Sequence, residues 1–165
     1  MIRKKDNFYT NKDSEFLKES DLVIYYNEKP KNLLKNVAVI GGKSDFSKVD
    51  IPKTSEKLPL LLARLAYVFE IYEKELKNSD EFEDFVEILK GIRVKKEIQN
   101  HNTTLEEVAG ILYLMDEAKK ISVIIGDIDE EELMNLLSFL KMFEIKIGVF
   151  SKNDISGYEI SFYDV

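Results

Sequence analysis

The chain has 165 residues, of which 44% are hydrophobic and 33% are charged, so it is long enough for one folded domain with a sizeable core. It contains no cysteine, which excludes disulfides, thiolate metal sites and cysteine nucleophiles and fits a reducing compartment. The net charge of −7 argues against broad electrostatic binding to nucleic acid or anionic lipid.

The chain begins with charged residues, Met1 to Asp6, that lead into no apolar segment, so we expect no secretory signal. Its longest apolar run, residues 58–69, contains Arg64 and is shorter than the roughly 20 residues that cross a bilayer. We therefore expect a soluble, cytoplasmic protein that binds no membrane. Lysine far outnumbers arginine and glutamine occurs once, a bias typical of a hyperthermophile or of an AT-rich genome.

The pattern predicts a polar N-terminal arm over residues 1–20, with at most a short helix near residues 15–18. A single α/β domain is expected over residues 21–165. Its first strands are predicted at residues 22–26 and 37–40, because both runs are compact, apolar and rich in β-forming residues. A polar loop should follow from residue 43 to residue 54.

A long helix is predicted over residues 58–77, with Ser55 as its N-cap and Pro59 in its first turn, where a missing N–H costs little. Its first three turns are apolar on every side, and such a helix is buried on all sides. One flank should contact the sheet, and the other should lie under another helix or a second subunit. The residues expected at that outer interface are Leu60, Leu61, Arg64, Val68 and Ile71. Arg64 can pair with a buried carboxylate, cross a subunit interface or extend into solvent.

The middle of the chain fits more than one secondary structure. A helix capped by Ser79 should end at Gly91, whereas residues 92–98 fit either an edge strand or a continued helix. Four basic residues lie here, and we expect a solvated, charged edge in preference to a phosphate contact: Lys90, Arg93, Lys95 and Lys96. His101, the single histidine, follows in a turn and is expected to be solvated; no serine or cysteine motif accompanies it, so a triad is not supported.

The second half of the chain predicts a strand–helix–strand unit. A capping box formed by Thr103 or Thr104 with Glu106 or Glu107 should begin one helix. A buried strand at residues 121–125, a helix capped by Asp129 and a strand at residues 145–150 follow within thirty residues, which makes the two strands parallel.

The last segment completes the expected fold. Residues 158–163 alternate between apolar and polar, and the preceding turn-rich stretch suggests an antiparallel strand at an edge. The sequence therefore predicts an α/β fold with three layers. Its sheet should be mixed and mostly parallel, with helices on its faces and a C-terminal antiparallel edge strand.

Two loops follow expected parallel strands, where ligands of such sheets bind. The first begins Gly41-Gly42-Lys43-Ser44 and resembles the end of a P-loop, but Val37 stands where that motif needs its first glycine. The backbone N–H groups of these four residues can still approach a phosphate. The alternative is that the glycines only allow a positive φ in a turn.

The second loop carries two carboxylates, Asp127 and Asp129, directly after a buried strand. Two carboxylates so placed can share a divalent cation such as Mg²⁺. The alternative is that Asp129 caps the following helix and Asp127 is a turn residue, an arrangement that needs no cofactor.

Together the two loops resemble the Toprim domain, the metal-binding fold of topoisomerases, primases and some nucleases. That family has a strand followed by Glu-Gly-x-x-Asp and a later strand followed by Asp-x-Asp. Residues 40–45 and 126–129 occupy those places, and the resemblance spans about residues 37–150. Gly41 stands where the family keeps its catalytic glutamate, so the resemblance implies a relative without phosphoryl-transfer activity.

No nucleophile, base and orienting residue can be assembled from the sequence, and no strong cofactor motif is present. We therefore expect a non-catalytic interaction module or a subunit of a larger assembly, without a cofactor, that forms a homo-oligomer or binds a protein partner. The alternative is a metal- or nucleotide-phosphate-binding enzyme domain that uses loops 41–45 and 126–129. Nucleic-acid binding ranks third because the whole molecule repels polyanions.

Overall fold

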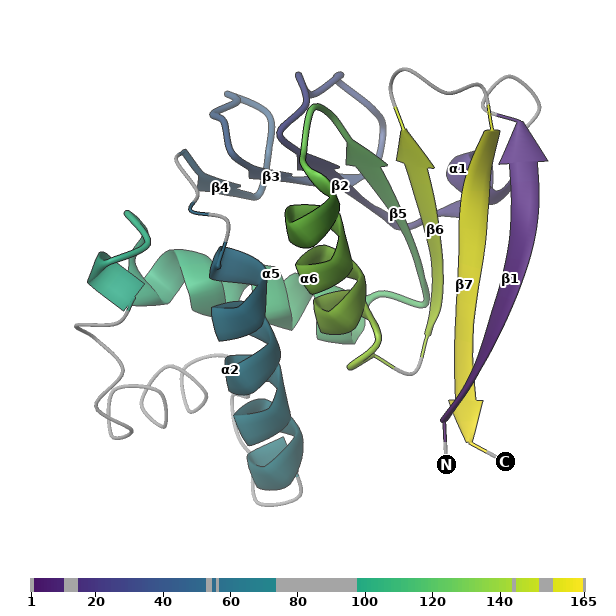
Figure 1. The fold of residues 1–165 in the computed structure, drawn as a ribbon. Helices are drawn as coiled ribbons and strands as arrows, with labels where there is room; N and C mark the ends of the chain where they lie inside the picture. Colours follow the sequence, from purple (N-terminus) through teal and green to yellow (C-terminus); the bar gives the residue numbers. More distant parts are fainter. Residues whose placement is uncertain are drawn as a thin grey trace.

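A computed structural model of the chain describes residues 2–10, 15–52, 55, 57–73, 98–143, 145–151 and 156–164 (Figure 1). The strands are β1 (Ile2–Thr10), β2 (Leu22–Tyr26), β3 (Asn36–Ile40), β4 (Val49–Ile51), β5 (Lys120–Ile125), β6 (Lys146–Ser151) and β7 (Ser156–Asp164). The helices in these ranges are α1 (Glu15–Glu19), α2 (Leu58–Glu73), α5 (Leu105–Glu117) and α6 (Glu130–Leu140). The expected α/β class is confirmed.

The strands form one sheet in the order β1-β7-β6-β5-β2-β3-β4, and the five strands from β6 to β4 are parallel. β2 lies in the middle of these five, with β3 and β4 on one side and β5 and β6 on the other. The strand order therefore reverses between β2 and β5. In open parallel sheets, ligands bind outside the carboxyl ends of the strands at such a topological switch point.

The two terminal strands close one side of the sheet. β7 runs antiparallel to β6, and β1 pairs antiparallel with the other side of β7. The C-terminal strand is therefore internal, and the prediction that it forms the edge was wrong. Residues 2–10, assigned to a polar arm, form β1, so the two chain ends lie side by side (Figure 1). The charged sequence of β1 carries no apolar alternation that would have predicted a strand.

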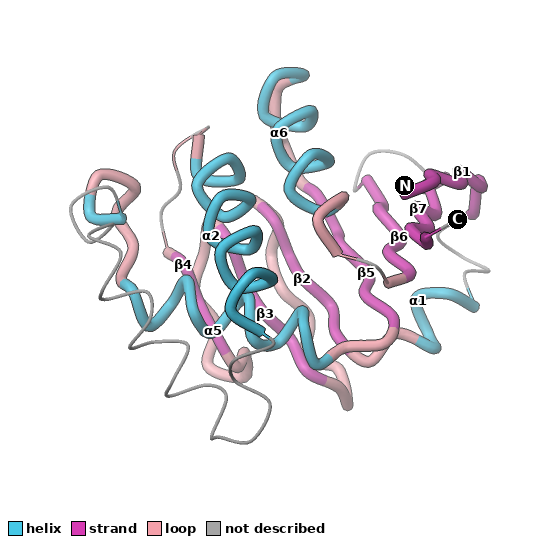
Figure 2. The backbone as a smooth tube through the Cα atoms, turned by 90° about the horizontal axis from the view of Figure 1, so that it is seen from below, coloured by secondary structure: helices cyan, strands magenta, loops and turns pink. Residues whose placement is uncertain are grey.

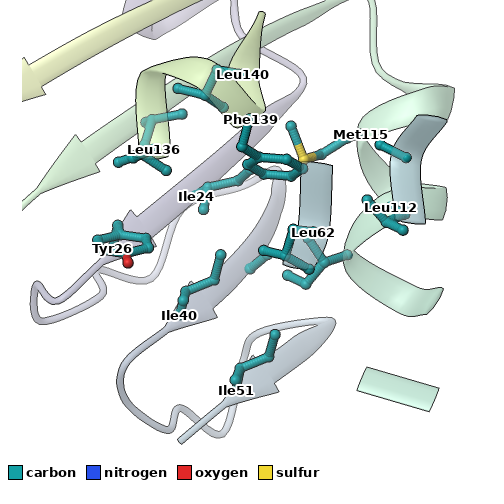
Figure 3. Close-up of a cluster of buried hydrophobic side chains, with 14 of the residues drawn as sticks. Ile24, Tyr26, Ile40, Ile51, Leu62, Leu112, Met115, Leu136, Phe139 and Leu140 are labelled. Carbon is teal, nitrogen blue, oxygen red and sulfur yellow. The ribbon is translucent and has the colours of Figure 1, made fainter. Parts of the chain in front are cut away.

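Helices lie on both faces of the sheet, but unequally. Alternate side chains of β2 and β3, among them Ile24 and Ile40, contact α2, α5 and α6 in one large buried cluster (Figures 2 and 3). The opposite face has a smaller cluster, in which Tyr25 and Val39 pack with Leu17 of α1. The period-2 alternation of the strands therefore divides the core between a thick helical layer and a thin layer.

The predicted caps of α5 and α6 are confirmed. Thr104 and Glu107 form the expected capping box of α5, with hydrogen bonds of 3.2 and 3.1 Å between side chain and backbone N–H in each direction. Asp129 caps α6, because its Oδ1 accepts the N–H of Glu132 at 2.7 Å. The side chain of Ser55 does not follow its prediction as an N-cap: its carbonyl oxygen accepts the N–H of Leu58, and its hydroxyl contacts His101.

Some expectations differ from the structure or lie outside it. Residues 49–51, expected within a loop, form the short strand β4 because they pair with β3. The expected helix over residues 79–91, the ambiguous segment before Ile98 and the basic cluster of residues 90–96 lie outside the described residues. Within the described ranges, no helix is both long enough and apolar enough to cross a membrane.

Candidate functional site

The carboxyl ends of β2, β3 and β5 meet around Asn27. The Asn27 N–H donates to the carbonyl oxygen of Ile40 at 2.8 Å, which joins the end of β2 to the end of β3. The Gly126 N–H donates to the carbonyl oxygen of Tyr26 at 2.9 Å, which joins β5 to β2. The two loops that the sequence singled out therefore begin on either side of Asn27, at the switch point of the sheet.

Both loops begin with glycine because Asn27 fills the space that a side chain would need. A Cβ on Gly126 would lie 1.8 Å from the Asn27 carbonyl oxygen, and a Cβ on Gly41 would lie 2.0 Å from Asn27 Oδ1. Gly41 also has a φ of 87°, and Asn27 itself has a φ of 52°. The turn explanation for Gly41 therefore agrees with the geometry, since glycine adopts such a φ without strain.

The backbone groups expected to hold a phosphate are engaged within the chain. The N–H groups of Gly41 and Gly42 both donate to the Ile51 carbonyl oxygen, at 2.7 and 3.3 Å. The Ser44 N–H donates to a carboxylate oxygen of Asp50 at 3.3 Å. Lys43, the fourth residue proposed for this site, is exposed. A phosphate would have to displace these acceptors and lie beside the Asp50 carboxylate, so the geometry disfavours an anion here.

A buried carboxylate at the switch point is the feature that the sequence did not predict. Glu132 lies in the first turn of α6 and is only 7% exposed. Its Oε1 accepts the hydroxyl of Tyr26 at 2.8 Å and the side-chain amide of Asn27 at 3.3 Å. Glu132 therefore ties the end of β2 to α6. A buried tyrosine hydroxyl needs a partner, but a separation of 106 residues hides that partner from sequence patterns.

Tyr25 lies on the other face of β2, next to Tyr26 and Asn27 at the carboxyl end of the strand. Burial raises the pKa of the Tyr25 hydroxyl; a backbone hydrogen bond from Lys31 opposes this shift, and the carboxylate of Glu28 adds to it. Together with the buried Glu132, these groups make the carboxyl end of β2 polar on both faces of the sheet.

The two aspartates proposed to share a cation behave differently from each other. Asp129 uses Oδ1 to cap α6, so its predicted role as an N-cap is confirmed, whereas Asp127 is an exposed residue of the loop. Among the residues that the structure describes, no group of three or more histidine, cysteine, aspartate or glutamate side chains is arranged to hold a metal ion. A cation site therefore has no arranged ligand set within these ranges.

The long helix α2 is not buried on all sides. Leu61, expected at the interface, is buried within its own chain as part of the large core cluster, and α2 packs against α6. Leu60 is 44% exposed and Tyr67 is 56% exposed, and Arg64 between them is also exposed. These three residues lie one helical turn apart, on the side of α2 opposite the core. The side chains of the other two expected interface residues, Val68 and Ile71, lie outside the description.

His101 is half-buried, in contrast to its expected solvation, and its Nδ1 is hydrogen-bonded to the hydroxyl of Ser55. The two residues are 46 positions apart, so no local sequence motif predicts the contact.

The sequence matches no protein-family model, and no curated protein is significantly similar to it. The candidate sites are therefore interpreted from their own geometry.

Proposed function

We propose that this protein is an interaction module that forms a homodimer through the outer face of α2, defined by Leu60, Arg64 and Tyr67. The observation that carries the proposal is the alignment of two large, half-exposed apolar side chains on one helix face, with a single cation between them. Single exposed apolar residues are common on protein surfaces, but an aligned set rimmed by polar residues is typical of an interaction surface. Tyrosine and arginine are also the residues most enriched among energetically dominant contacts.

The spacing within this face suits a two-fold axis. Arg64 and Tyr67 are three residues apart, so an antiparallel pair of α2 helices with its axis between them brings each Arg64 next to the partner's Tyr67. A guanidinium over a tyrosine ring contributes roughly 0.5–2 kcal/mol, and the two-fold axis repeats the contact. Met134 on the neighbouring helix α6 is a further exposed apolar residue of the helical layer.

Sedimentation velocity of the purified chain tests this proposal, with a dimer as the expected result. Tyr67→Glu should give a monomer, because it removes the ring and places a carboxylate in the apolar contact. Leu34→Glu is the matched control, because Leu34 is a fully exposed apolar residue in the β2–β3 connection. A monomeric native chain, or equal loss of the dimer in both variants, contradicts the proposal; binding of a different protein to the same face is the remaining alternative.

A cation or small polar ligand at loops 41–45 and 126–129 is the second candidate function. The strand order favours it, because the switch point between β2 and β5 is where open parallel sheets bind ligands. The engaged N–H groups of Gly41 and Gly42 and the capping role of Asp129 weigh against it. We therefore rank it below the interaction module.

A further inference from the structure

Two connections of the fold meet at a serine and the single histidine of the chain. Ser55 lies in the segment that leads from β4 to α2, and His101 lies in the turn that precedes α5. The hydroxyl of Ser55 is hydrogen-bonded to His101 Nδ1. Both side chains are half-buried, so each keeps part of its surface accessible.

Backbone hydrogen bonds hold the turn that carries His101. The His101 N–H donates to the carbonyl oxygen of Ile98 at 3.0 Å, and the Asn102 N–H donates to that of Gln99 at 3.1 Å. Asn102 takes a φ of 56°, a conformation that asparagine tolerates better than most residues. Ile98 is buried in the large core cluster and therefore fixes the turn to the rest of the protein.

A buried hydroxyl without a hydrogen bond lies two residues further along. Thr103 is only 5% exposed, and its Oγ1 is one of the buried polar atoms that have no partner among the described residues. Thr103 also directly precedes Thr104, the N-cap of the 13-residue helix α5. The described residues give this hydroxyl no acceptor, which is uncommon for a buried polar group.

We propose that Ser55 is a nucleophile activated by His101 and that the pair forms an acyl-transfer dyad. A serine hydroxyl is a weak nucleophile until a neighbouring base accepts its proton, and a histidine within hydrogen-bond reach is the usual base. The substrate class is an ester of a small carboxylic acid.

The reaction needs no further co-reactant except water. In the Nε2–H tautomer of His101, Ser55 donates its proton to Nδ1 while Oγ bonds to the ester carbonyl carbon. The tetrahedral intermediate then expels the alcohol, which takes the proton from His101. Water attacks the acyl-serine, gives a proton to His101, and the collapse releases the carboxylic acid and returns the proton to Ser55.

The lack of native cysteine allows a direct test of activation at position 55. In Ser55→Cys, a histidine partner should lower the thiol pKa, so that the thiol reacts with iodoacetamide at pH 6 at least about tenfold faster than an exposed control thiol. Ser138→Cys supplies that control, since Ser138 is an exposed residue of α6. The enhancement should disappear when His101→Gln is added to Ser55→Cys.

The native serine is tested with a fluorophosphonate probe and with p-nitrophenyl acetate. Labelling mapped to Ser55 by mass spectrometry, and ester hydrolysis lost in Ser55→Ala, are the expected results. Circular dichroism checks that each variant folds. If His101→Gln fails to fold, the comparison of Ser55→Cys with Ser138→Cys still decides the question. Equal alkylation rates of those two thiols, or no labelling of Ser55, would overturn the proposal and leave the hydrogen bond a purely structural link.

Discussion

Replacing Glu132 with alanine tests the hydrogen bonds that tie β2 to α6 at the switch point. The Glu132 carboxylate is buried and accepts from both Tyr26 and Asn27. Its removal leaves the fully buried Tyr26 hydroxyl without this partner. Glu132→Ala should therefore lower the stability of the whole folded protein and not only that of one loop.

The magnitude follows from the groups involved. A hydrogen bond to a charged group contributes about 1.5–3 kcal/mol, and a buried hydroxyl left without a partner costs about 1–3 kcal/mol. These ranges describe overlapping effects and are not added, so Glu132→Ala should lower the free energy of unfolding by about 3 kcal/mol. Glu132→Gln keeps an acceptor oxygen for the Tyr26 hydroxyl and should cost about 1 kcal/mol.

Urea unfolding followed by circular dichroism gives these free energies. Glu131→Ala is the matched control, because Glu131 is exposed in the same turn of α6, and it should change stability by less than about 0.5 kcal/mol. Tyr26→Phe combined with Glu132→Ala should be less destabilised than the sum of the single variants, by about 1–2 kcal/mol, because both changes remove the same hydrogen bond. Additive effects, or a Glu132→Ala variant as stable as the control, would refute the reasoning.

Two further predictions concern the same end of the sheet. Asp129→Ala should lower the free energy of unfolding by about 0.5–2 kcal/mol because the cap is lost, and Asp129→Asn should lower it much less. Asp127→Asn should be near neutral. Titration calorimetry should detect no Mg²⁺ binding, and a micromolar affinity that is lost in both asparagine variants would restore the cation hypothesis. Because the pKa of Tyr25 is raised above its ordinary 10.0, its contribution to stability is present below that pH and is lost as the pH rises through the folded pKa. Between about pH 9 and about pH 11, Tyr25→Phe should therefore lose less stability than the native chain, and equal losses would contradict this prediction.

Four of the five parallel strands, β2, β3, β5 and β6, were predictable because their own residues specify them. Residues 22–26 were assigned correctly as β2, since a short apolar run of β-forming residues suits a strand buried on both faces. Asp129 was assigned correctly as a cap because capping depends on neighbours within three residues. β1 and β4 were missed for the opposite reason: their conformation depends on pairing with β7 and β3.

The candidate sites were harder to predict because their contacts join distant parts of the chain. The apolar residues of α2 identified a buried helix, but they could not show that Leu61 is buried while Leu60 and Tyr67 stay exposed. Ser55 and His101 carry no shared motif, and their hydrogen bond follows from how two connections of the fold lie side by side. Sequence patterns report local conformation and burial, and these sites depend on tertiary packing.

The chain's own groups fill the switch point of the sheet. This explains why the proposed dimer contact and the proposed site at Ser55 lie elsewhere. In an open parallel sheet, the ends of β2 and β5 normally offer free backbone N–H groups and an uncovered cleft to a ligand. Here the Gly126 N–H binds the end of β2, the Gly41 and Gly42 N–H groups bind the end of β4, and Asn27 occupies the space above both glycines. Glu132 also accepts hydrogen bonds from the side chains of Tyr26 and Asn27. A ligand at this position would have to break contacts that stabilise the fold, whereas a partner on the outer face of α2 or a small ester beside Ser55 would break none of them.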